Sequence, residues 1–191
     1  MTGKKRSSGI FIALILLAAM FCSCGGNDAE AKAGEELDRL KSSETAASSL
    51  DAVKEALPQD AGEDFDAFLA KVRDFDYEII GSEAVSEEGE ELTIVDVKIT
   101  SYDFGREYIS TWKDYLKTHK NASAGDAEGQ EFYKALFSRL SKLEDKNHIS
   151  FVEIRVTETE DGLTSDIQTN EELQDALFGG MISEMKTLAE G

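Results

Sequence analysis

The sequence predicts an α+β fold, in which a curved antiparallel sheet of about four strands packs on helices. Three observations lead to this prediction. Apolar residues recur every three or four positions in some segments, as in amphipathic helices, and every second position in others, as in strands. The strand-like segments form two pairs, each joined by a short polar turn. Helix-like segments stand before, between and after these pairs, so helices and strands are segregated along the chain.

The first helix-like segments precede the first strand pair. Leu37 and Leu40 indicate a short helical stretch. The pattern of residues 48–51 resembles a capping box, and we expect the helix after it to end at Pro58, the only proline. An apolar stripe then predicts a further helix over residues 64–72.

Residues 75–100 predict a β-hairpin. Apolar and acidic side chains alternate over residues 75–79, and alternation returns over residues 92–100 after an acidic, glycine-containing turn at 86–90. One face of the second strand carries Val95, Val97 and Ile99.

Two helices follow the hairpin. Aromatic residues at helical spacing predict a helix from residue 104 to 115, with Asp103 as its N-cap. A second apolar stripe predicts a helix over residues 132–143, after a loop that contains Gly125 and Gly129.

The second strand pair and a last helix complete the domain. We expect strands at 149–157 and 163–167, joined by a turn at 160–162. Thr169 and the glutamate three residues later predict the start of the last helix, in which Gly179-Gly180 is expected to act as a break or a point of close packing.

Residues 1–23 resemble the signal peptide of a bacterial lipoprotein. The cations at 4–6 precede an unbroken apolar run at 10–21, which is shorter than the roughly 20 residues that a membrane-spanning helix needs. The chain then becomes polar directly after Cys24. We expect residues 1–23 to be cleaved and the rest to reside outside the cytoplasm.

Cys24 is the expected lipidation site. Ser23 precedes it and Gly25 follows, as the lipoprotein motif requires, whereas Cys22 would have the bulky Phe21 before it. A disulfide between the two cysteines would close a strained ring. Two thiols without a nearby histidine are too few ligands for zinc. We therefore expect an anchor in the cell membrane at its extracytoplasmic face, and no metal or cofactor.

We expect three parts in the chain. Residues 1–23 are the signal peptide, residues 24–35 are a lipidated N-terminus and flexible linker, and residues 36–191 are a single α+β domain. The linker is inferred because residues 25–35 show no apolar periodicity. Every aromatic residue after the signal lies between Phe65 and Phe178, so the core is expected mainly from about residue 65 onward.

Three segments carry a resemblance to a known family. They are the hairpin with its Ile-Thr-Ser-Tyr-Asp ending at 99–103, the Glu-Asp-Gly turn at 160–162, and the closing Glu-Leu-Gln-Asp-Ala-Leu-Phe-Gly-Gly at 172–180. Over residues 36–180 the chain resembles uncharacterised lipoproteins of Gram-positive bacteria with a domain similar to nuclear transport factor 2 or cystatin. Those relatives often have a tryptophan at the place of Leu163. The resemblance implies a cone-shaped sheet around a long helix and implies no reaction.

Net charge excludes one class of partner. The chain carries −19 at pH 7, and removal of residues 1–23 takes away three cations and no acid, which gives −22. Nucleic acid would be repelled by such a surface. Solubility is the simplest reason for the charge.

Candidate catalytic residues are few. Within the resembled fold, an aspartate base and a tyrosine donor can act inside the cone, which points to Asp96, Tyr102 and Asp103. We favour structural roles for the aspartates, on a solvent-facing strand position and at a helix cap. His119 and His148 lie on different elements without ligand spacing, and we expect them at the surface.

Three functions remain open. The leading one is a non-catalytic binding or interaction module for a cell-envelope protein or small-molecule ligand. The second is an enzyme with a cone-shaped pocket and an Asp/Tyr acid–base pair, which a buried, unpaired carboxylate in a cavity would favour. The third is a small substrate-binding lipoprotein of an importer, which the single domain disfavours.

Overall fold

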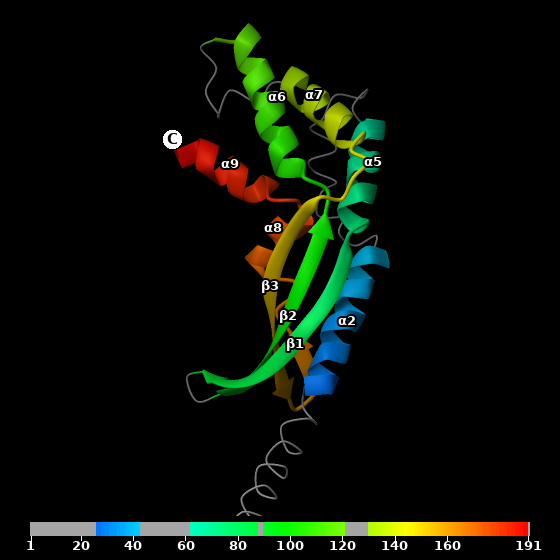
Figure 1. Cartoon of the computed structure of the whole chain (residues 1–191), viewed down its shortest axis with the longest axis vertical. Coiled ribbons are helices and arrows are strands. Elements are labelled where there is room, and N and C mark those ends of the chain that lie inside the picture. The colour runs from blue at the N-terminus through cyan, green and yellow to red at the C-terminus, as the bar shows by residue number, and fades with distance from the viewer. Residues whose placement is uncertain (1–25, 43–61, 88–89, 121–129, 191) are drawn as a thin grey trace, which may run out of the picture.

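The computed structural model describes residues 26–42, 62–87, 90–120 and 130–190. The expected signal peptide 1–23, the lipidation site Cys24 and the helix predicted to end at Pro58 lie outside these residues. Within the described part, the predicted fold class is confirmed: helices pack on an antiparallel sheet that does not close (Figure 1).

The sheet is a four-stranded meander with the order β1-β2-β3-β4. Its strands are β1 (Asp76–Glu87), β2 (Glu90–Ser101), β3 (His148–Thr159) and β4 (Gly162–Ser165), and every neighbouring pair is antiparallel. Both predicted hairpins are therefore confirmed. The last strand is shorter than expected, because Ile167 turns into the core at 4% exposure instead of continuing the ladder.

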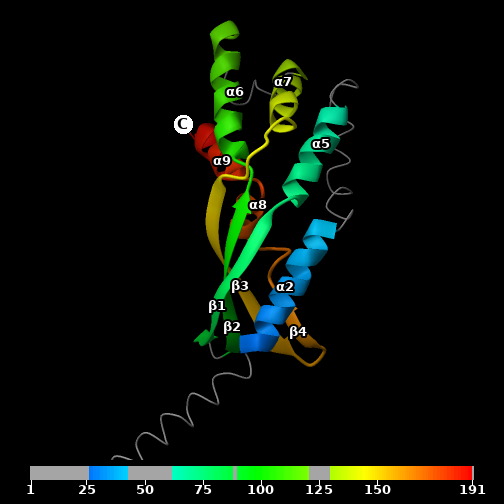
Figure 2. The same cartoon turned by 45° about the vertical axis from the view of Figure 1, so that its right-hand side comes forward.

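One face of the sheet, which we call the inner face, is covered by α2 (Gly26–Ser42) and α8 (Glu171–Leu177) (Figures 1 and 2). Alternate residues of the strands point toward these helices. The core that they form contains Ala29, Ala33, Leu37, Phe75, Val95, Val97, Ile99, Val152, Ile154, Val156, Ile167, Leu173 and Ala176.

The prediction of a flexible linker at 24–35 is wrong for the residues of this range that the structure describes. Residues 26–35 belong to α2, and Ala29 and Ala33 are 1% and 0% exposed against the sheet. Together with Leu37 they recur every four residues, which places them on one side of the helix. The domain core therefore begins before residue 36.

The remaining helices form a second core beyond one end of the sheet (Figure 2). They are α5 (Gly62–Arg73), α6 (Phe104–Thr118), α7 (Gln130–Leu140) and α9 (Met181–Glu190). Their facing surfaces are rich in aromatic rings that meet edge to face, such as Phe65 on Phe137 with ring centroids 4.9 Å apart. Trp112 belongs to this helical cluster and not to the inner face of the sheet.

The predicted break at Gly179-Gly180 is confirmed and separates α8 from α9. Both glycines have positive φ, +54° and +75°. A β-carbon on Gly179 would lie 1.9 Å from the carbonyl oxygen of Tyr102, so the close approach excludes any side chain. The start of α8 differs slightly from expectation: Asn170, not Thr169, accepts the capping hydrogen bond from the Leu173 N–H.

Candidate binding surface

The face of the sheet opposite α2 and α8, here called the outer face, has no described helix packed on it (Figure 1). Most of its side chains are polar, which is typical of the solvent-exposed face of an antiparallel sheet. Three of its large apolar side chains are strongly exposed. Ile80 and Ile149 are each 55% exposed and Phe151 is 71% exposed.

Strand register explains why these side chains point outward. Val152 and Ile154 fill the inner face, so their neighbour Phe151 must point the other way. Ile80 reaches the outer face through a β-bulge, since the register shifts between Ile79 and Gly81 and leaves Ile80 without a partner on β2.

A hollow of ≈ 410 Å³ lies between two of these apolar side chains. Its lining combines Ile80 and Phe151 with carboxylates and with backbone of the central strands. The lining residues are Ile80, Asp96, Val97, Phe151, Val152, Glu153 and Glu172. No lysine or arginine lines the hollow.

The three carboxylates of this hollow are Asp96, Glu153 and Glu172. Within the described part of the chain, none of them forms a salt bridge or a side-chain hydrogen bond. Asp96 and Glu153 are direct cross-strand partners on β2 and β3. Like charges directly opposite each other in a sheet are destabilising. The hollow therefore concentrates uncompensated negative charge beside exposed apolar surface.

A second hollow, of ≈ 850 Å³, lies farther along the strands toward the β3–β4 turn. Its lining includes Leu92, Thr157 and Thr164, and Arg155, which pairs with Glu87 at 3.5 Å. The lining also contains Asp166, whose carboxylate accepts from the Arg155 N–H at 3.0 Å. Each charged side chain of this hollow therefore already has a partner within the chain.

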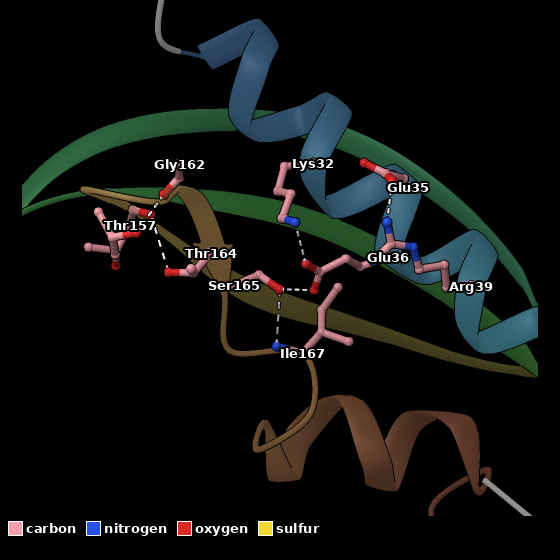
Figure 3. Close-up of polar contacts among 10 residues, drawn as sticks. Lys32, Glu35, Glu36, Arg39, Thr157, Gly162, Thr164, Ser165 and Ile167 are labelled. Carbon is pink, nitrogen blue, oxygen red and sulfur yellow. Dashed lines mark hydrogen bonds and ion pairs between the residues drawn. The ribbon is translucent and has the colours of Figure 1, made fainter. Parts of the chain in front are cut away.

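Beside the second hollow, polar contacts hold α2 against β4 (Figure 3). Glu36 of α2 accepts hydrogen bonds from Lys32, at 2.8 Å, and from the Ser165 hydroxyl, which itself accepts from the Ile167 N–H. Burial raises the pKa of Glu36, but the hydrogen bonds from Lys32 and Ser165 outweigh it and the net shift is downward. This cluster is fully partnered, and it orients α2 on the sheet.

The sequence candidates do not gather in one site. Asp96 is exposed on the outer face. Asp103 caps α6, as expected, by accepting from the Arg106 N–H at 3.1 Å.

Tyr102 lies where the sheet meets the helical cluster. Its hydroxyl donates to Asp74 at 2.8 Å, and the Lys71 ammonium lies 4.6 Å from its ring centroid. Burial is the main cause that raises the pKa of Tyr102, and the bond to Asp74 adds to it. Tyr102 thus links the two cores.

The histidines lie apart from each other. The His119 ring stacks on Tyr115 with centroids 4.0 Å apart, and His148 contacts the Ser150 hydroxyl at 2.9 Å. Among the described residues, no cluster of three or more histidine, cysteine, aspartate or glutamate side chains is arranged to hold a metal. In the same residues, every buried side-chain nitrogen or oxygen has a hydrogen-bond partner.

Comparisons with known proteins add one structural likeness. No family model matches the sequence, and no curated protein matches it. The fold is similar to the crystal structure of ycdA from Bacillus subtilis, a protein provisionally classed as a lipoprotein, with a TM-score of 0.32 and 14% identity. The likeness covers 73% of this chain and 44% of that one, so this chain spans less than half the length of ycdA.

No described helix combines the length and apolar character needed to cross a bilayer.

Sequence reasoning missed the exposed apolar residues of the outer face. A signal for one of them was present, because Phe151 is out of phase with Val152, Ile154 and Val156, the set that matches a buried strand face. Ile80 had no such signal, since its orientation depends on the bulge.

Proposed function

We propose that this chain is an extracytoplasmic lipoprotein, anchored at Cys24, which acts as a non-catalytic binding module through the outer face of its sheet. The cationic start, the short apolar run and the Ser-Cys-Gly sequence at 23–25 support the anchor. A diacylated cysteine supplies two acyl chains, and two are needed for stable membrane attachment.

One observation carries the binding role. Ile80 and Phe151 expose large apolar side chains beside a hollow on the one sheet face that no described helix covers. Exposed apolar clusters with a polar rim mark interaction sites in other proteins. The inner face offers less to a ligand, because α2 and α8 fill it with side chains that are almost fully buried.

Kinship with cystatin-like or nuclear transport factor 2-like lipoproteins is part of this proposal. The arrangement of a helix followed by an antiparallel meander, with that helix packed on one face of the curved sheet, supports it. Such folds serve binding modules as well as enzymes, so the function rests on the surface and not on the fold.

The anchor is tested by fractionating cells that produce single-cysteine variants. Cys24→Ala should release the folded domain from the membrane, whereas the matched control Cys22→Ala should leave it in the membrane fraction. Equal membrane retention of both variants would refute lipidation at Cys24. Equal loss of membrane retention in both variants would mean that attachment depends on the whole segment and not on one thiol.

The binding surface is tested by site-specific photo-crosslinking in living cells. A photoreactive phenylalanine analogue at position 151 should give a discrete adduct, and Ile80→Ser should abolish it. The same analogue at Met185, which is 41% exposed on α9, is the matched control and should give none. Adducts of equal yield at both positions, or no adduct at position 151, would contradict the proposal.

A further inference from the structure

We propose that the free edge of β3 binds an extended, basic polypeptide segment, which joins the sheet as an additional strand beside the acidic hollow. This inference rests on the proposed function, because it specifies the partner chemistry of the same outer face.

The edge of β3 is open over residues 148–152. β4 pairs only with Val156–Thr159, so the first part of β3 has β2 on one side and no described strand on the other. In Figures 1 and 2 no described strand lies next to this length of β3, and the described element close to it is α8, which packs on the inner face. At about 3.4 Å per residue, the open stretch is roughly 17 Å long.

Backbone groups of β3 face this open side. The Arg155 N–H donates to the Asp166 carboxylate at 3.0 Å, and the Arg155 carbonyl accepts from the Asp166 N–H at 3.1 Å. The Glu153 carbonyl accepts from Asn170 at 2.8 Å. Since alternate residues of a strand direct their backbone groups to the same side, Ile149 and Phe151 also direct theirs away from β2. The chain thus satisfies its own edge from Glu153 onward and leaves the edge before it available.

Protection of the two sheet edges differs. β1, the opposite edge, carries a bulge at Ile80 and several acidic residues, which are features that prevent pairing with another chain. The run Ile149-Ser150-Phe151-Val152 has no charge, no proline and no bulge. An unprotected edge with exposed apolar side chains is a template for strand addition.

The charges around this edge indicate which kind of polypeptide segment would bind there. Asp96, Glu153 and Glu172 line the adjacent hollow without any cation among them. A lysine or arginine of an added strand would lie beside Glu153 on the outer face and would offset its repulsion with Asp96. A second copy of this chain is disfavoured, because each copy carries −19 at pH 7. An extended, basic segment is therefore the occupant that fits.

The test measures binding of a synthetic peptide to the purified whole chain by calorimetry. The probe is an end-blocked peptide of four Lys-Val repeats, and its matched control has Glu in place of Lys. We expect the Lys-Val peptide alone to bind, and its affinity to fall with added salt. The double variant Asp96→Asn/Glu153→Gln should bind about tenfold more weakly, as loss of two partly exposed ion pairs implies.

Two controls separate strand addition from simple charge attraction. Glu158→Gln removes an exposed acid from β3 where β4 already pairs with it, and it should leave binding unchanged. Methylation of alternate backbone nitrogens of the Lys-Val peptide removes the donors that a strand needs, with no change to the protein, and should abolish binding.

Several results would overturn the inference. They are equal binding of the Glu-Val peptide, undiminished binding of the methylated peptide, equal losses from Glu158→Gln and the double variant, or no binding at millimolar peptide. A dimer in sedimentation that Ile149→Pro dissociates would instead identify a second copy as the occupant. The peptide assay does not involve the lipid anchor. If the peptide does not bind but the photoreactive residue at position 151 still gives its adduct, the strand-addition inference is refuted and the proposed function is not.

Discussion

Replacing Leu37 with alanine tests whether α2 belongs to the core. Leu37 is 0% exposed and packs against the inner face of the sheet. A buried Leu→Ala change costs about 2–5 kcal/mol, because apolar contacts are lost and a cavity remains. We expect the free energy of unfolding to fall by about 3 kcal/mol, since the alanines at 29 and 33 cannot fill the space.

The assay is urea and thermal unfolding of the purified chain, followed by circular dichroism. A loss of about 3 kcal/mol corresponds to a midpoint lower by roughly 6–12 °C for a domain of this size. Glu35→Ala is the matched control on the same helix, because its pair with Arg39 is exposed and contributes only about 0.3–0.5 kcal/mol. If Leu37→Ala costs no more than Glu35→Ala, α2 is not part of the cooperative unit and the reasoning is refuted.

Three further outcomes are expected. Gly179→Ala should destabilise the chain far more than Gly81→Ala in the same unfolding assay. The β-carbon on Gly179 would meet the Tyr102 carbonyl, whereas the one on Gly81 meets nothing within 4 Å, and equal losses would refute this. Tyr102→Phe should cost about 1 kcal/mol through loss of the bond to Asp74, and an unchanged urea midpoint would contradict that. The Lys146 hydrogen bond is the main cause that lowers the pKa of Asp74 below its usual value of 3.8 in the folded state. The stabilisation from this pair is therefore present above pH 3.8 and is lost as the pH falls below it, so Asp74→Asn should make acid unfolding less steep in the range below about pH 4, and an unchanged acid transition would contradict this.

Periodicity was sufficient to predict the strands and the aromatic-rich helices. The alternation around Val95, Val97 and Ile99 identified β2 and its buried face, because only a strand places these residues together against a core. Asp103 was predicted as a helix cap for the same local reason, since a short acceptor side chain before an apolar stripe satisfies free N–H groups.

The beginning of α2 was not predicted, because its buried stripe consists of alanines. Ala29 and Ala33 carry too little apolar surface to stand out in a hydropathy pattern, although they are spaced for one face of a helix. The alanines are buried only because the sheet supplies a surface close enough for small side chains. That information lies in the tertiary fold and not in the segment.

The candidate surface could not be predicted from local sequence patterns, for a similar reason. Ile80 points outward because of a bulge, and the hollow exists because Glu172 of α8 lies beside the strands that carry Asp96 and Glu153. No pattern along the chain relates residue 172 to residue 96. The division of the apolar residues into two cores likewise depends on helix packing, which periodicity does not specify.

The early start of α2 limits how far a lipid at Cys24 would let the domain move. Two residues span at most about 7 Å, and Gly26 already belongs to the packed helix. The ends of the β1–β2 hairpin and the β3–β4 turn lie at the same end of the molecule as Gly26 (Figures 1 and 2). This end would therefore rest at the lipid headgroups, where exposed Glu87, Glu160 and Asp161 would repel anionic lipids. The domain would stand upright with its helical cluster outermost, and a partner strand would approach β3 parallel to the membrane normal, from the side.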